Sequence, residues 1–222
     1  MCGRFSLIAS ADQLRDRFGV QIREPLKSRY NIAPTQTIPI ITNTNPEEIT
    51  LARWGGLPQW AKDEHSSYSM INAKAETIEE KPTYREPFKH KRCLIPADGF
   101  YEWKKAGTKK VPFRFTRKDG NLFAFAGLYD EWEHEGKHVL SCTIITTRAN
   151  ELVSKVHDRM PVILEEKYEK AWLENSKLGI LKRMLQPYPA DKMESTQVSD
   201  KVNSPRNDSK GILAAEKNLK SF

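Results

Sequence analysis

Cysteine is scarce in this chain: Cys2, Cys93 and Cys142 are the only three in 222 residues. An odd number of widely spaced cysteines, with no C-x-x-C pair, argues against a disulfide framework and a tetrahedral zinc site. Cys93 and Cys142 lie in apolar, strand-like runs, and we interpret both as small buried hydrophobic residues. Cys2 is different, because chain ends usually fray and position 2 is a poor place for a core residue.

Long hydrophobic runs are also lacking. No apolar stretch approaches the length that spans a bilayer, and the first residues lack the layout of a secretory signal. With 38% hydrophobic and 29% charged residues, a chain of 222 residues is long enough for one large core. We therefore expect a cytoplasmic protein without a membrane partner, built as a single domain over residues 1–205 with a polar C-terminal tail at 206–222.

Acidic residues are outnumbered. The 36 lysines and arginines exceed the 29 aspartates and glutamates, so the formal net charge is +7. An excess of this kind is typical of proteins with polyanionic partners. Because the basic residues are spread along the chain, we expect contacts to phosphates rather than base-specific recognition.

The pattern of strands and helices predicts an α+β fold. A capping box at 10–13 begins a helix that Gly19 ends, and the proline-containing stretch 30–42 is typical of an edge strand. Further strands are predicted at 47–54, 93–97, 99–105, 111–117, 121–132, 138–147 and 194–199, and helices at 148–156, 165–175 and 178–186. Without β-α-β alternation, this order indicates a mostly antiparallel, curved or barrel-like sheet flanked by short helices.

One motif resembles a metal site. HEGKH, from His134 to His138, matches the zinc pattern H-E-x-x-H, which needs both histidines on one face of a helix. Here it falls between two strand signals with Gly136 in the middle. We interpret it as a hairpin turn and predict no metal and no cofactor.

Three polar residues lie in stretches that suggest chemistry. Asn72 lies in MINAKAET, where Glu76 follows four places later, and His157 precedes Asp158 in KVHDRMP. In DGFYEW, strand alternation puts Glu102 on the same side as Phe100. Partial burial would raise the pKa of this carboxylate and suit it to proton transfer. Taken singly, each residue also has an ordinary structural explanation.

Taken together, six motifs resemble one family. MCGRF, RYNIAPTQ, WGGLPQWAKD, MINAKAET, CLIPADGFYEWKK and KVHDRMPVIL occur in the order seen in the SOS-response-associated peptidase (SRAP) family. The resemblance runs from Cys2 to about Asn203. It implies the SRAP fold and a protein that senses abasic sites in single-stranded DNA and shields them covalently, with junctions between single and double strands as a further candidate substrate. It also implies association with the nucleoid when the DNA is damaged.

The resemblance assigns roles to particular residues. Cys2 becomes the nucleophile once Met1 is removed, and Asn72, Glu102 and His157 fall on the other active-site positions. Positions similar to those that contact DNA in the family are Arg4, Pro34, Trp60, Lys74, Arg85, Thr146 and Arg159. The family usually has arginine at the position of Lys74, so a forked phosphate contact there becomes a point charge.

Elementary chemistry explains why position 2 matters. After loss of Met1, Cys2 carries an α-amine and a thiol on adjacent carbons, and the amine is partly neutral at physiological pH. The amine can form an imine with the aldehyde of a ring-opened abasic sugar, and the thiol can close onto it as a five-membered thiazolidine. Elimination from the imine would give a weak lyase activity.

Three alternatives stay open at this point. An N-terminal-nucleophile glutamine amidotransferase also begins Met-Cys-Gly, but this chain has no Asn-Gly pair for an oxyanion donor and no room for a second domain. A non-covalent reader of single-stranded DNA or modified bases would bind intact and abasic strands alike. A general protease is the third. We expect the protein to act as a monomer.

Overall fold

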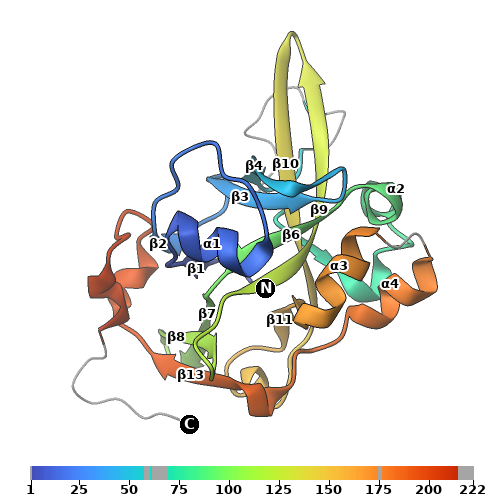
Figure 1. Ribbon diagram of the computed structural model, residues 1–222. Coiled ribbons are helices and arrows are strands. Elements are labelled where there is room, and N and C mark those ends of the chain that lie inside the picture. Colours follow the sequence, from blue (N-terminus) through green and yellow to red (C-terminus); the bar gives the residue numbers. More distant parts are fainter. Residues whose placement is uncertain (1, 58–60, 62–69, 175–176, 215–222) are drawn as a thin grey trace.

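The computed structural model describes residues 2–57, 61, 70–174 and 177–214 (Figure 1). Two sheets and short helices make an α+β fold, as predicted from the sequence. The helices are α1 (Ala11–Phe18), α2 (Pro82–His90), α3 (Glu166–Glu174) and α4 (Leu178–Met184). Among the described residues, no helix has the length and apolar character needed to cross a bilayer.

The larger sheet closes into a barrel. Its strands follow the order β10–β4–β3–β6–β9, and pairing of β9 with β10 completes the circle. The bounds are β3 (Thr37–Thr42), β4 (Asn45–Trp54), β6 (Arg92–Ala97), β9 (Phe123–His134) and β10 (Lys137–Arg148). Three short strands extend it, β5 (Asn72–Lys74) and β11 (Arg159–Pro161) on β10, and β12 (Ile163–Leu164) on β9.

The smaller sheet is antiparallel throughout, in the order β13–β8–β7–β1–β2. Its strands are β1 (Phe5–Leu7), β2 (Arg29–Ile32), β7 (Gly99–Ala106), β8 (Lys109–Arg117) and β13 (Met193–Gln197). The aromatic side chains of Phe5 and Phe100 from this sheet pack on Phe125 of the barrel. One apolar core therefore joins the two sheets.

Several local predictions are confirmed. The Ser10 hydroxyl accepts from the Gln13 backbone N–H and the Gln13 side chain accepts from the Ser10 N–H, which completes the capping box of α1. Gly19 ends the helix at a φ of 67°, a left-handed conformation that glycine adopts without strain. HEGKH is the tip of the long β9–β10 hairpin in Figure 1, and its two turn residues, Glu135 and Gly136, both have positive φ.

Other local predictions are wrong. The helix expected at 148–156 is only a 3-10 turn at Val153–Lys155, because β10 runs to Arg148 and the Asn150 side chain caps the turn. The stretch 30–42 forms two strands: β2 lies at an edge of the smaller sheet, as expected, whereas β3 lies between β4 and β6 in the barrel. Strand β3 tolerates Pro39 because β6 pairs only with Ile41 and Thr42, so no bond to β6 is lost. Helix α2 was not predicted, because its two prolines obscure the helical pattern.

Candidate functional site

The prediction that Cys2 is a poor core residue is wrong. Cys2 is buried within the main apolar core, next to the start of β1. Strand β1 pairs with β2 on one side and β7 on the other, so this end of the chain has partners that prevent fraying. Burial, and then the nearby charge of Glu102, raises the pKa of the Cys2 thiol far above its ordinary value. The thiol is therefore protonated at neutral pH.

Asn72 holds the backbone of Cys2 in place. Its side-chain Nδ2 donates to the Cys2 carbonyl at 2.8 Å, a contact between residues 70 positions apart. Asn72 itself begins β5, which pairs in parallel with β10 opposite Ile144. The Tyr84 hydroxyl of α2 donates to the Asn72 carbonyl at 3.2 Å. The predicted neighbours Cys2 and Asn72 are thus brought into direct contact.

Glu102 comes to Cys2 along β7. Phe5 of β1 lies opposite Phe100 of β7, and the Tyr101 N–H donates to the Arg4 carbonyl at 2.9 Å, so the first residues run alongside Glu102. As the alternation predicted, Phe100 belongs to the main core, while Tyr101 packs in a separate cluster on the other face. Burial raises the pKa of Glu102 from 4.5 to about 7. This carboxyl can therefore give or take a proton near neutral pH.

His157 shares a pocket with Glu102. The pocket has a volume of about 450 Å³, which suits a nucleotide-sized group, and also includes Trp103 and Asn203. The backbone N–H of Arg159 donates to His157 Nδ1 at 3.0 Å, which leaves the proton of the neutral ring on Nε2. Partial burial lowers the pKa of His157 below 6.5, which favours this neutral form. The approach of Asp158 to Nδ1 is a hydrogen bond only when the ring is protonated.

The residues expected to contact DNA differ in accessibility. Lys74 and Arg85 are exposed, and Pro34 is half-buried in the turn between β2 and β3. Trp60 lies outside the described residues. Thr146 is buried on β10, opposite Lys74 of β5.

Arg159 is already engaged. Its guanidinium binds both carboxylate oxygens of Glu76, at 2.7 and 2.9 Å, and also donates to the Thr146 carbonyl at 2.7 Å. Hydrogen bonding from Arg159 lowers the pKa of Glu76 below 4.5, so this carboxylate is charged at neutral pH. The sequence marked Glu76 only by its position in the Asn72 motif; its pairing with a residue 83 positions away carries no local signal.

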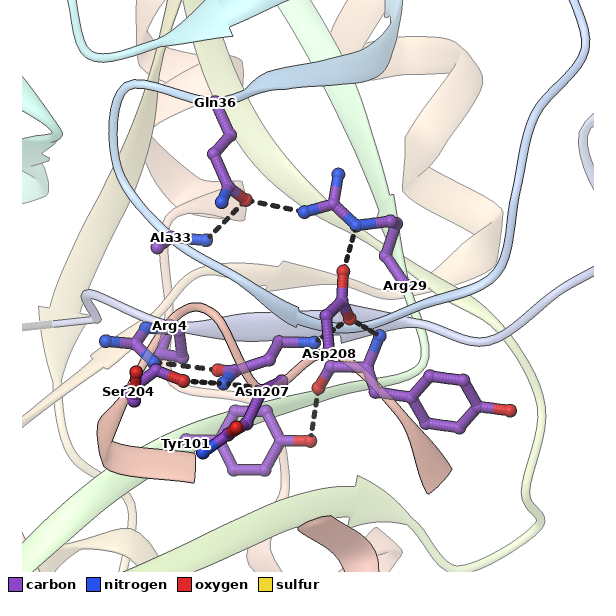
Figure 2. Close-up of polar contacts among 10 residues, drawn as sticks. Arg4, Arg29, Ala33, Gln36, Tyr101, Ser204, Asn207 and Asp208 are labelled. Atoms are coloured by element: carbon purple, nitrogen blue, oxygen red, sulfur yellow. Dashed lines mark hydrogen bonds and ion pairs between the residues drawn. The ribbon is translucent and has the colours of Figure 1, made fainter. Parts of the chain in front are cut away.

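Arg4 is held by the C-terminal segment 202–208, which packs over β1 and β2 and is called the clasp below (Figure 2). Its Nη1 donates to the Asn31 side chain at 2.8 Å and to the Val202 carbonyl at 2.7 Å. The Asn31 amide in turn donates to the carbonyls of Val202, Ser204 and Asn207. Asp208 accepts from the N–H groups of Tyr30 and Asn31 and pairs with Arg29, so it covers the edge of β2. Residues of the predicted polar tail thus pack on the domain, and Ile212 is buried there.

We predict that Asp208→Ala lowers the free energy of unfolding by about 2 kcal/mol, because two backbone N–H groups of β2 lose their acceptor. Asp208→Asn keeps an acceptor oxygen and should lose less than half of that amount. Urea denaturation followed by circular dichroism measures both. Asp191→Ala, at an exposed aspartate, is the matched control, and an equal loss in the control would contradict a role for the clasp.

Comparisons with known proteins agree with this architecture. The family model described as "SOS response associated peptidase (SRAP)" matches residues 1–205. The chain is 48% identical to the abasic site processing protein YoaM of Bacillus subtilis, over 99% of this chain and 100% of that protein. It is 32% identical to the abasic site processing protein HMCES of Gallus gallus, over 96% of this chain and 77% of that protein. A crystal structure of a Bacteroides thetaiotaomicron protein superimposes with a TM-score of 0.87 at 30% identity, covering 97% of this chain and 100% of that one.

These matches define the class of protein. The chain belongs to the SOS response associated peptidase family. The resemblance read from six sequence motifs is therefore confirmed.

Proposed function

We propose that this protein captures abasic sites in single-stranded DNA by a covalent bond to Cys2. The observation that carries the proposal is the contact between the Asn72 amide and the Cys2 carbonyl, with Glu102 beside the same thiol. Membership of the family and the names of its relatives, abasic site processing proteins, support DNA damage as the context.

Removal of Met1 is the first step. Water cleaves the peptide bond between Met1 and Cys2, which releases methionine and leaves a free α-amine on Cys2. The protein itself would act as the peptidase in this step, with Glu102 moving the proton. The Asn72 amide, bonded to the Cys2 carbonyl, would hold the new terminus beside Glu102.

Capture of the lesion follows in two steps. The α-amine adds to the aldehyde of the ring-opened sugar and loses water, which gives an imine. The thiol then adds to the imine carbon, and its proton passes to the imine nitrogen, which closes the thiazolidine. Because amine and thiol belong to one residue, the second step is intramolecular and strongly favoured. β-Elimination from the imine would break the strand and gives the weak lyase activity.

Proton transfer needs a group that titrates near neutral pH. The Cys2 thiol is protonated, so ring closure requires a base, and the Glu102 carboxylate with a pKa of about 7 supplies one. His157 lines the same pocket and has its proton on Nε2. It would donate a hydrogen bond to the sugar or to a phosphate.

Basic residues outside the pocket, with some polar and aromatic ones, would hold the DNA strand. Phosphate contacts give affinity without sequence preference, and an aromatic side chain can stack on a base. The residues proposed to contact the strand are Arg4, Pro34, Trp60, Lys74, Arg85, Thr146 and Arg159. Arg4 and Thr146 would act indirectly, since Arg4 is held by the C-terminal segment and Thr146 is buried.

The test uses three single-stranded oligonucleotides that are intact, abasic, or abasic with the aldehyde reduced to an alcohol. We expect a conjugate that survives a denaturing gel only with the unreduced abasic strand. Equal non-covalent binding to all three strands without a conjugate would instead indicate a reader of single-stranded DNA. Release of ammonia from glutamine would indicate an amidotransferase.

A further inference from the structure

Glu76 binds the guanidinium of Arg159, which is the group that a DNA phosphate would otherwise bind. Its two oxygens bind Nη1 and Nη2 of Arg159, the side-by-side geometry in which guanidinium also binds phosphate. The second Nη2 hydrogen goes to the Thr146 carbonyl, and Nε is buried without a hydrogen-bond partner among the described residues. Of the five N–H groups of Arg159, three are thus taken and one is buried. A forked contact between Arg159 and a phosphate is not available while Glu76 is in place.

Glu76 also lowers the net positive charge that Lys74 and Arg159 present to DNA. Lys74 and Arg159 contribute two positive charges, and Glu76, whose pKa is lowered chiefly by its bond to Arg159, contributes one negative charge. The Glu76 side chain is 48% exposed whereas that of Arg159 is 14% exposed. An approaching phosphate therefore meets the carboxylate before it meets the guanidinium.

We propose that Glu76 is a specificity-determining residue that competes with DNA phosphates for Arg159. By holding the fork of Arg159, it keeps the affinity for intact single strands low, so that retention on DNA depends on the covalent bond to a lesion. This inference rests on the proposed function for the identity of the ligand. It adds that the strength of non-covalent binding is limited by the protein's own carboxylate.

The decisive variant is Glu76→Gln, which keeps the shape and removes the charge. We expect its affinity for an intact single-stranded oligonucleotide to rise three- to tenfold at low salt. The slope of log K against log salt concentration should steepen by about 0.7, as for one additional neutralised phosphate on a single strand. Glu79→Gln is the matched control, since Glu79 lies three residues further on and pairs with Lys182 at 2.6 Å.

Coupling to Arg159 separates competition from a general charge effect. In the wild type, Arg159→Ala should lower the affinity for the intact strand only slightly. In the Glu76→Gln background, the same substitution should lower that affinity by a factor at least three times larger. With abasic DNA, Glu76→Gln should lower the half-saturating DNA concentration for capture while leaving the maximal capture rate unchanged. Added intact strands should inhibit capture by this variant more strongly than capture by the wild type.

Two results would overturn the proposal. If Glu76 only braces Arg159 for DNA, then Glu76→Gln would weaken binding. If the effect were one of overall charge, Glu79→Gln would strengthen binding equally. Because binding of intact DNA needs no aldehyde, these outcomes are independent of whether the protein forms a conjugate with abasic strands.

Discussion

Cys2→Ala is expected to abolish the heat-stable conjugate with abasic DNA, with a fall of at least about 100-fold in its yield. The variant keeps an α-amine once Met1 is lost, so it should still form the imine, which hydrolyses readily. Borohydride reduction should therefore trap a conjugate of the variant that is absent without the reductant. The physical reason is the loss of the intramolecular thiol, whose effective concentration drives ring closure.

A second variant tests whether the amine and the thiol must belong to the same residue. Insertion of a single glycine between Met1 and Cys2 separates the terminal amine from the thiol, and we expect no thiazolidine from it. Intact-mass measurement of each terminus establishes whether Met1 has been removed. A heat-stable conjugate from Cys2→Ala, or from wild-type chains that retain Met1, would contradict the mechanism.

Glu102→Gln is expected to stabilise the fold while it slows the chemistry. Because the pKa of Glu102 rises from 4.5 to about 7 on folding, the folded state holds this proton more tightly than the unfolded state. Wild-type stability therefore falls as the pH rises from about 4.5 to 7, and then stays lower. Glu102→Gln has no carboxyl to lose a proton, so its free energy of unfolding should not fall in this range. Above pH 7 it should exceed that of the wild type by about 3 kcal/mol, and below pH 4.5 the two should be equal.

Among chains that have lost Met1, the same variant should form the heat-stable conjugate about 100-fold more slowly at pH 8, since it has no carboxylate to accept the thiol proton. The ratio of wild-type to variant rate should rise with pH and level off above about 7. Taking the ratio removes the titration of the terminal amine, which both proteins share. Rapid-quench gels at a series of pH values measure it.

Glu133→Gln is the control for both measurements, because Glu133 is exposed on β9 at the far end of the long hairpin. Any effect of Glu133→Gln on the free energy of unfolding or on the rate of conjugate formation should be the same at every pH between 4.5 and 8. A pH-independent ratio for Glu102→Gln, or an equal gain in stability for the control, would contradict the role assigned to Glu102.

Local structure was predictable where a few neighbouring residues determine it. The capping box and Gly19 define both ends of α1, and the β9–β10 turn follows from Glu135 and Gly136 between two strands. The alternation in DGFYEW assigned Glu102 to the face of Phe100. Prediction failed where tertiary contacts override local preference, as at 148–156, where β10 pairs with β11 through Arg148 and only a 3-10 turn at Val153–Lys155 follows.

The composition of the site was also present in the sequence, but its assembly was not. Asn72, Glu102 and His157 could be named from their motifs and from the family resemblance. Nothing in those motifs shows that the Asn72 amide binds the Cys2 carbonyl, that Glu76 binds Arg159, or that Asp208 covers β2. Each of these contacts joins residues at least 70 positions apart.

The sequence by itself therefore determined the family, the strand and helix pattern and the reactive residue types, since these depend on local spacing and side-chain chemistry. Only the tertiary structure decided the protonation of the site. Burial of Cys2 between the sheets keeps the thiol protonated, and burial of Glu102 beside it brings that carboxyl to a pKa of about 7. Both effects arise from desolvation, which depends on what surrounds a group in space rather than on its neighbours in the chain.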